Sequence, residues 1–149
     1  ANITRAEFVQ VLANIAGADL TSYKTKDNFN DVKSSDWYAG AVNWAYENGI
    51  VSGKGEGKYD PNAKITREEM CVMLVKYAAF KGITLLESEE KTIFADDEKI
   101  SGWAKDAVYA CQMADIVNGK GEGRFDPAGT GLRAEACVIF TKFHQNYLK

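Results

Sequence analysis

Three stretches of the chain place hydrophobic residues at positions i, i+3, i+4 and i+7, the spacing of one face of an α-helix. Polar residues fall between them and would point away from that face. The stripes are Phe8, Val11, Leu12 and Ile15; Met70, Met73, Leu74 and Tyr77; and Ala136, Ile139, Phe140 and Phe143. Three equivalent faces predict an all-α fold in which the three helices meet in a bundle with approximate threefold symmetry.

A capping box opens two of these helices, because a threonine is followed three residues later by a glutamate and the two side chains satisfy backbone N–H groups reciprocally. The pairs are Thr4 with Glu7 and Thr66 with Glu69. The third helix has Leu132 in the place of the threonine and keeps Glu135. We expect the start of that helix to be weaker or capped in another way.

Two further helices are predicted over residues 37–48 and 103–114, where apolar residues again recur at helical spacing. Gly49 follows the first of them, at the place where a left-handed conformation often ends a helix. The glycine-rich loops that come next can form only tight turns or very short β-ribbons. Each loop therefore connects two helices.

The chain repeats itself at an offset of 65 to 66 residues, so its helices and loops are copies of one unit. Residues 1–7 match residues 63–69, which means that the chain opens partway through a further copy. We predict one domain over residues 1–149. Within it, residues 1–28 are the second half of a first repeat with its connector, residues 29–93 a second repeat, and residues 94–149 a third.

Composition and charge exclude several classes of function. The 149 residues carry a net charge of −3, which argues against a nucleic-acid partner. Three cysteines and one histidine at unsuitable spacing predict no metal site, no cofactor and free thiols, and we expect Cys71, Cys111 and Cys137 all to be buried. No apolar run is long enough for insertion into a membrane.

Three arginines occupy a position that a helix disfavours. Arg5, Arg67 and Arg133 each stand at the first helical position, where the helix dipole opposes a positive charge. One explanation is that the guanidinium and the N–H groups of the helix start bind an anion such as a carboxylate. The alternative is an internal ion pair, for example from Arg67 to Asp31 or Asp60.

Two tryptophans are the second candidates for chemistry. Trp37 and Trp103 stand at the predicted starts of equivalent helices, where each ring either packs the preceding loop onto the core or offers a flat face to a sugar. We expect Tyr38 and Tyr59 to add amphipathic surface nearby. The glycine loops could bring backbone N–H groups to a ligand, although their spacing does not match a phosphate loop and a geometric role is favoured.

Together these segments resemble the S-layer homology family. The resemblance is carried by Phe-x-Asp-Val, Trp-Tyr-Ala-x-Ala-Val, Gly-Ile-Val-x-Gly, Tyr-Asp-Pro-Asn and Ile-Thr-Arg-x-Glu, in this order and over nearly the whole chain. It implies a pseudo-trimer of three motifs around a helical bundle. It also implies an anchor that attaches bacterial surface proteins to the secondary polysaccharide of the cell wall, commonly through a pyruvylated sugar, which bears a carboxylate.

The resemblance further implies a set of ligand-binding residues, located in grooves between adjacent motifs. They are Arg5, Arg67, Arg133, Trp37, Trp103, Asp31, Asp96, Gly53 and Gly119. Chain order pairs Arg5 with Trp37 and Arg67 with Trp103. The third groove would lack its partner, because the first half of the first motif is missing and another chain or segment would have to supply it.

We therefore expect a non-catalytic wall-binding module at the bacterial cell surface, in the wall or in the S-layer. The alternative is a surface module for protein–protein assembly, in which the arginines form structural ion pairs and no glycan is bound. A glycosidase would need a pair of carboxylates at the scissile bond. No such pair stands out among the many acidic residues.

Overall fold

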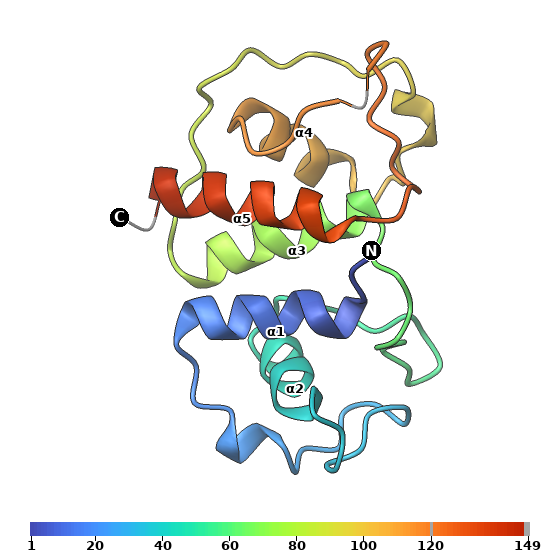
Figure 1. Cartoon of the computed structure of the whole chain (residues 1–149), viewed down its shortest axis with the longest axis vertical. Coiled ribbons are helices and arrows are strands. Elements are labelled where there is room, and N and C mark those ends of the chain that lie inside the picture. The colour runs from blue at the N-terminus through green and yellow to red at the C-terminus, as the bar shows by residue number, and fades with distance from the viewer. Residues whose placement is uncertain (120, 148–149) are drawn as a thin grey trace. The chain divides into compact units, whose positions relative to one another are not determined.

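The computed structural model describes residues 1–119 and 121–147, which contain five α-helices, two short 3-10 helices and no sheet (Figure 1). The prediction of an all-α fold is therefore confirmed. Two compact units divide the chain: one is Ile3–Lys64 and the other combines Ala1–Asn2 with Ile65–Lys149. The unit Ile3–Lys64 joins the second half of the first predicted repeat to the first half of the second, whereas the other unit joins the second half of the second repeat to the whole of the third.

The unit Ile3–Lys64 consists of α1 (Arg5–Ala16), η1 (Thr21–Tyr23), α2 (Ala39–Glu47) and the loops around them. Helix α1 packs on α2, and each helix carries fully buried residues, such as Val9 in α1 and Ala45 in α2. Gly49 follows α2 with φ 74°, the left-handed conformation that its position predicts. A single β-bridge between Gly55 and Lys58 forms the short ribbon of the glycine loop.

The other unit contains α3 (Arg67–Phe80), η2 (Asp97–Lys99), α4 (Lys105–Met113) and α5 (Arg133–Tyr147). Helix α3 packs on α4, as α1 does on α2. Helix α5 lies beside α3 (Figure 1), and their hydrophobic stripes meet where the ring centroids of Tyr77 and Phe143 are 6.0 Å apart.

The residue before each long helix forms an isolated antiparallel β-bridge with a second segment of its own unit. These bridges join Thr4 to Lys64, Thr66 to Thr130, and Leu132 to Asn2. The three bridges occupy equivalent places in the repeat. In the first two bridges the partner, Lys64 or Thr130, follows an Asp-Pro turn. In the third bridge the partner is Asn2.

Helices α2 and α4 begin two residues later than the sequence predicts, and each ends one residue earlier. The reason is a turn before each helix: the N–H of Ala39 donates to the carbonyl of Asp36, and that of Ala104 to the carbonyl of Ser101. These bonds span three residues rather than four, so Trp37 and Trp103 lie in the approach to a helix and not inside it.

Nine of the twelve stripe residues are buried and belong to the core. Ile15 is exposed, and Val11 and Phe140 are half-buried. All three cysteines are free thiols, as predicted, and Cys71 and Cys111 are buried. Cys137 is exposed, so the prediction of its burial is wrong. The threefold arrangement of the bundle stays a prediction.

Candidate functional site

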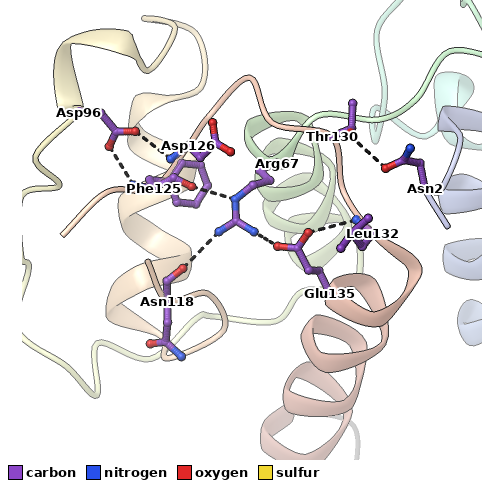
Figure 2. A network of polar contacts seen from close by, with 9 residues as sticks. All are labelled: Asn2, Arg67, Asp96, Asn118, Phe125, Asp126, Thr130, Leu132 and Glu135. Atoms are coloured by element: carbon purple, nitrogen blue, oxygen red, sulfur yellow. Dashed lines mark hydrogen bonds and ion pairs between the residues drawn. The ribbon is translucent and has the colours of Figure 1, made fainter. Parts of the chain in front are cut away.

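Arg67, at the first position of α3, has a guanidinium that protein groups hold on three sides (Figure 2). Its Nε donates to the carbonyl of Phe125 at 2.8 Å and its Nη2 to that of Asn118 at 3.2 Å. Its Nη1 forms an ion pair with the carboxylate of Glu135. Arg67 lies over the Phe125 ring, with its Cζ 4.9 Å from the centroid, and is only 6% exposed.

Arg5 repeats this arrangement in the other unit. Its Nε donates to the carbonyl of Tyr59 at 3.0 Å, and its Cζ lies 4.4 Å from the centroid of the Tyr59 ring. Arg5 is 3% exposed and Tyr59 is fully buried, so the expectation that Tyr59 adds surface is wrong. Tyr38 is also buried. Both arginines thus clamp the aromatic residue that precedes an Asp-Pro turn.

The N–H groups at the starts of α1 and α3 already have partners. The first two N–H groups of α3, from Arg67 and Glu68, donate to the carbonyls of Gly129 and Pro127. Those of α1, from Arg5 and Ala6, donate to Ala63 and Pro61. The next N–H of each helix donates to the capping threonine. Neither helix start offers its backbone to an anion in this structure.

Asp31 and Asp96 fix the turns that the arginines clamp. Both carboxylate oxygens of Asp96 accept backbone N–H groups, from Phe125 and Asp126, at 2.8 Å each (Figure 2). Asp31 accepts those of Tyr59 and Asp60 at 2.9 and 2.8 Å. Asp60 and Asp126 have positive φ angles of 61° and 62°, so these bonds hold a conformation that L-residues rarely adopt.

Burial alone would raise the pKa of Asp96. The N–H bonds from Phe125 and Asp126, together with the backbone of Asp96 and the charge of Lys99, stabilise the charged form by more than burial opposes it, so the pKa of Asp96 lies below its ordinary value. The carboxylate therefore acts as a permanent acceptor at neutral pH. The sequence suggested an internal ion pair from Arg67 to Asp31 or Asp60. The structure shows an ion pair of Arg67 with Glu135 instead.

Gly53 and Gly119 stand where a side chain would collide with the loop itself. A Cβ at Gly53 would lie 2.8 Å from the carbonyl of Lys58 and 2.9 Å from the ring of Phe29. A Cβ at Gly119 would lie 2.8 Å from the carbonyl of Arg124. Close packing thus explains both glycines without a ligand.

The predicted capping residues perform their expected roles. Thr4 with Glu7 and Thr66 with Glu69 both form complete capping boxes. Glu135 keeps one half of the box, because its Oε1 accepts the N–H of Leu132 at 3.1 Å. Its other oxygen is the partner of Arg67, so this single carboxylate serves both α5 and α3 (Figure 2).

Trp37 and Trp103 are exposed by 61% and 65%, which makes them the most exposed of the large hydrophobic residues in the described part of the chain. The explanation in which each ring packs its loop onto the core is therefore wrong. Each lies two residues before a helix, in equivalent turns of the two units. Exposed aromatic rings at repeated positions suit contact with an outside molecule.

Arg133 differs from the other two arginines because it is exposed. Its backbone N–H donates to the carbonyl of Ala1 at 2.9 Å. Chain order places Arg5 with Trp37 in one unit and Arg67 with Trp103 in the other. Whether each pair lines one groove stays a prediction.

A polar hollow beside α4 was not predicted. It has a volume of about 540 Å³ and is lined by Glu89, Glu90, Thr92, Gln112, Asp115 and Asn118. The sequence offered only a charged connector here. The arginine clamps had a clearer signal in the sequence. Arg5 and Arg67 occupy equivalent positions of the repeat, and so do Tyr59 and Phe125, the aromatic residues directly before the two Asp-Pro pairs.

The described residues contain no group of three or more histidine, cysteine or acidic side chains that could hold a metal ion. In the same part of the chain, none of the helices has the length and apolar character needed to cross a membrane.

Clamped Asp-Pro turns, capped long helices and exposed tryptophans define a repeated helical module with two copies of one candidate surface. Residues 28–71 and 93–137 match the S-layer homology domain. The chain belongs to the S-layer homology family. Proteins with this domain are anchored at the cell surface or in the S-layer, where the module has a general role in attachment to the cell wall.

Several characterised proteins contain a region similar to the chain. It is 39% identical over 139 residues to an amylopullulanase of Thermoanaerobacterium thermosulfurigenes, which covers 92% of this chain and 7% of that protein. It is 28% identical over 143 residues to a cellulosome-anchoring protein of Acetivibrio thermocellus, covering 95% and 32%. With the surface-layer 125 kDa protein of Lysinibacillus sphaericus, identity is 29% over 148 residues, covering 97% and 12%. The chain thus spans a third or less of each of these relatives.

Proposed function

We propose that this chain is a non-catalytic anchor that binds the secondary polysaccharide of the cell wall. The observation that carries the proposal is the exposure of Trp37 and Trp103 at equivalent turns of the two units. A flat aromatic face binds the apolar side of a sugar ring, and such a contact needs no further ordering of the protein. Two such faces on one chain strengthen attachment to a repeating polymer by raising the effective concentration.

The proposed grooves contain the arginine clamps as well as the tryptophans. Arg5 and Arg67 fix the turns after the glycine loops, together with Asp31, Asp96, Gly53 and Gly119. Because Arg5 and Arg67 are buried, their role in the proposed site is to position these turns. A pyruvyl carboxylate would reach one of these guanidiniums only if a turn opens, whereas Arg133 is already exposed.

The proposal is tested by sedimentation with purified cell walls. Trp37→Ala and Trp103→Ala should each weaken binding, and the double variant should reduce it by more than either alone. Leu86→Ala and Ile93→Ala are matched controls, because these side chains are similarly exposed apolar groups at 58% and 59%. Equal sedimentation of the double variant and the two controls would contradict the assignment of the tryptophans.

The recognised group is tested separately with polysaccharide that carries or lacks its pyruvyl groups. We expect binding to weaken when the carboxylate is removed, and to weaken at higher salt because an exposed charge pair is screened. Binding that is equal for both polymers would mean that the sugar ring alone is recognised. No reducing sugar should be released in either mixture, since the proposed role is attachment.

A second candidate function is protein–protein assembly at the surface, which the Arg67–Glu135 ion pair favours because it gives the arginine a purely structural role. Walls stripped of their secondary polysaccharide separate the two functions. The proposed anchor should no longer sediment with stripped walls. An assembly module would bind them as before if the protein partner is retained.

A further inference from the structure

Asparagine stands directly before glycine at two places in the chain, Asn48-Gly49 and Asn118-Gly119. In such a pair the glycine nitrogen can attack the amide carbon of the asparagine side chain, because glycine has no side chain of its own to hinder the approach. The five-membered ring closes only if the side chain is free to move and the glycine N–H is free to lose its proton. The two pairs differ in both respects.

Both reacting groups of the first pair are held at the end of α2. The side-chain Nδ2 of Asn48 donates to the carbonyl of Trp44 at 2.8 Å, and the N–H of Gly49 donates to the carbonyl of Tyr46 at 3.1 Å. Asn48 is also half-buried. Ring closure at Asn48 must therefore break two hydrogen bonds and open the last turn of the helix.

The second pair lies in the glycine loop after α4, where Asn118 and Gly119 are both exposed. Among the described residues, neither the side chain of Asn118 nor the N–H of Gly119 has a hydrogen-bond partner. Figure 2 shows the Asn118 side chain pointing away from Arg67. Asn118 also lines the polar hollow beside α4. The two reacting groups are thus free, and water reaches them.

The reaction of this pair has two steps, and water is its only co-reactant. In the first, the N–H of Gly119 gives its proton to water, the nitrogen bonds to the side-chain carbon Cγ of Asn118, and the amide nitrogen takes a proton from water and leaves as ammonia. In the second, water adds to one of the two carbonyl carbons of the ring and opens it. Opening at Cγ gives aspartate. Opening at the backbone carbonyl carbon gives isoaspartate, in which the main chain continues through Cγ.

Arg67 holds the backbone carbonyl at which isoaspartate forms, because the oxygen of Asn118 accepts its Nη2 at 3.2 Å (Figure 2). A guanidinium at this oxygen stabilises the negative charge that develops when water adds to the same carbonyl. Opening there turns the carbonyl into a free carboxylate, and a carboxylate binds a guanidinium more strongly than a carbonyl does. Arg67 therefore favours isoaspartate over aspartate.

We propose that Asn118 is a self-modification site, which converts to isoaspartate in the folded chain and places a new carboxylate beside Arg67, while Asn48 stays intact. The equivalent of Asn118 in the other unit is Ser52, which has no side-chain amide to lose. Modification therefore makes the two glycine loops chemically different. The proposal does not involve glycan binding, so either can fail without the other.

The test incubates the folded chain at neutral pH and physiological temperature. Peptide mass spectrometry follows each asparagine through the small mass gain that accompanies replacement of the amide nitrogen by oxygen. We expect Asn118 to convert at least about tenfold faster than Asn48, because Asn48 reacts only when the end of α2 opens. In denaturant the two pairs should convert at similar rates, since neither is then held by the fold.

Two variants are matched controls for the chemistry. Asn118→Ser carries the residue of the other unit and should leave this loop unmodified. Asn118→Gln keeps a side-chain amide, but its longer side chain must close a larger ring, so conversion should be much slower. Both variants should keep the helix content of the unmodified chain by circular dichroism, which separates a loss of the reaction from a loss of the fold.

The product is identified by electron-transfer fragmentation, which distinguishes isoaspartate from aspartate in the peptide that contains residue 118. We expect a larger share of isoaspartate from the folded chain than from the chain in denaturant, where Arg67 no longer holds the carbonyl.

Two results would overturn the proposal. Asn118 could stay intact in the folded chain or convert no faster than Asn48. Alternatively, the share of isoaspartate could be no larger in the folded chain than in denaturant, and Arg67 would then have no influence on how the ring opens.

Discussion

The carboxylate of Glu135 links two helix starts, because one oxygen accepts the N–H of Leu132 before α5 and the other forms the ion pair with Arg67 at the first position of α3. Arg67 is buried, and its remaining donors go to the carbonyls of Phe125 and Asn118. A guanidinium can serve these three acceptors at once, which an ammonium cannot do with its compact geometry.

Replacement of Arg67 should therefore destabilise the fold before it affects a ligand. Arg67→Ala leaves the Glu135 carboxylate and two carbonyls without their partner, and we expect a loss of about 3 kcal/mol in the free energy of unfolding. Arg67→Lys should lose about half of that, since the ammonium reaches fewer acceptors. Urea unfolding followed by circular dichroism measures both.

Arg124→Ala is the control for this series, because Arg124 is an exposed arginine in the same glycine loop. Its stability should lie within about 0.5 kcal/mol of that of the unmodified chain. If Arg67→Ala is as stable as Arg124→Ala but no longer binds cell walls, the arginine has a direct role in the ligand site and the structural interpretation is wrong.

The low pKa of Asp96 predicts an acid limit to stability. The folded pKa lies below the unfolded value of about 3.9, so the unfolded state binds more protons and stability falls as the pH falls. The contribution of Asp96 is thus complete above the unfolded pKa and is lost as the pH drops through the folded pKa. Asp96→Asn should remove this contribution and cost about 2 kcal/mol at neutral pH, because two charge-assisted bonds are weakened.

The measurement is the free energy of unfolding at several pH values between neutrality and strong acid. The difference between the unmodified chain and Asp96→Asn should shrink below the unfolded pKa. Asp106→Asn, at an exposed acidic residue of α4, should run parallel to the unmodified chain. A constant difference at all pH values would mean that the carboxylate charge of Asp96 does not stabilise the turn.

Features fixed by neighbouring residues were predictable from the sequence. The capping boxes at Thr4 and Thr66 need only a residue three positions away, and the helical stripes need only a spacing of three and four. The repeat extended each prediction to the second unit. It also placed Trp37 and Trp103 at equivalent positions, although as the first residues of helices and not in the turns before them.

Contacts between distant residues were not predictable in the same way. Arg67 stands 58 residues before Phe125 and 68 before Glu135, so its charge alone could not distinguish a ligand from an internal partner. The carbonyls that satisfy the N–H groups of α1 and α3 come from Asp-Pro turns far along the chain. For the same reason the repeat predicted the same burial for Cys137 as for Cys71. Cys71 is buried against Cys111 of α4, whereas Cys137 is exposed.

Tyr77 offers a test of the core. Its hydroxyl is buried, has no hydrogen-bond partner among the described residues, and burial raises its pKa. Tyr77→Phe removes a polar group that lost its water on folding, so we expect the variant to gain about 1 kcal/mol in the free energy of unfolding. Thermal unfolding by calorimetry would show the gain.

The matched control is Tyr109→Phe. The Tyr109 hydroxyl donates to Asp97 at 2.6 Å and accepts the N–H of Phe94 at 3.1 Å, so its removal should destabilise the protein by about 1 to 3 kcal/mol. If Tyr77→Phe loses as much as Tyr109→Phe, the Tyr77 hydroxyl has a partner in solution, such as a bound water.

The three cysteines should differ in reactivity in a way that reports the packing of each helix. The hydrogen bond with the Cys71 thiol, together with burial, raises the pKa of Cys111 well above its ordinary value, so Cys111 holds almost no reactive thiolate at neutral pH. Cys71 is shielded at the same contact, whereas Cys137 is exposed on α5. We expect a thiol reagent to modify one cysteine per chain under native conditions and all three in denaturant, with Cys137 identified by peptide mass spectrometry.

Cys137→Ser should abolish the native reaction and leave the two slow thiols unchanged. Native modification of Cys71 or Cys111 at a rate similar to that of Cys137 would show that the contact between α3 and α4 opens readily, contrary to the close packing of these helices.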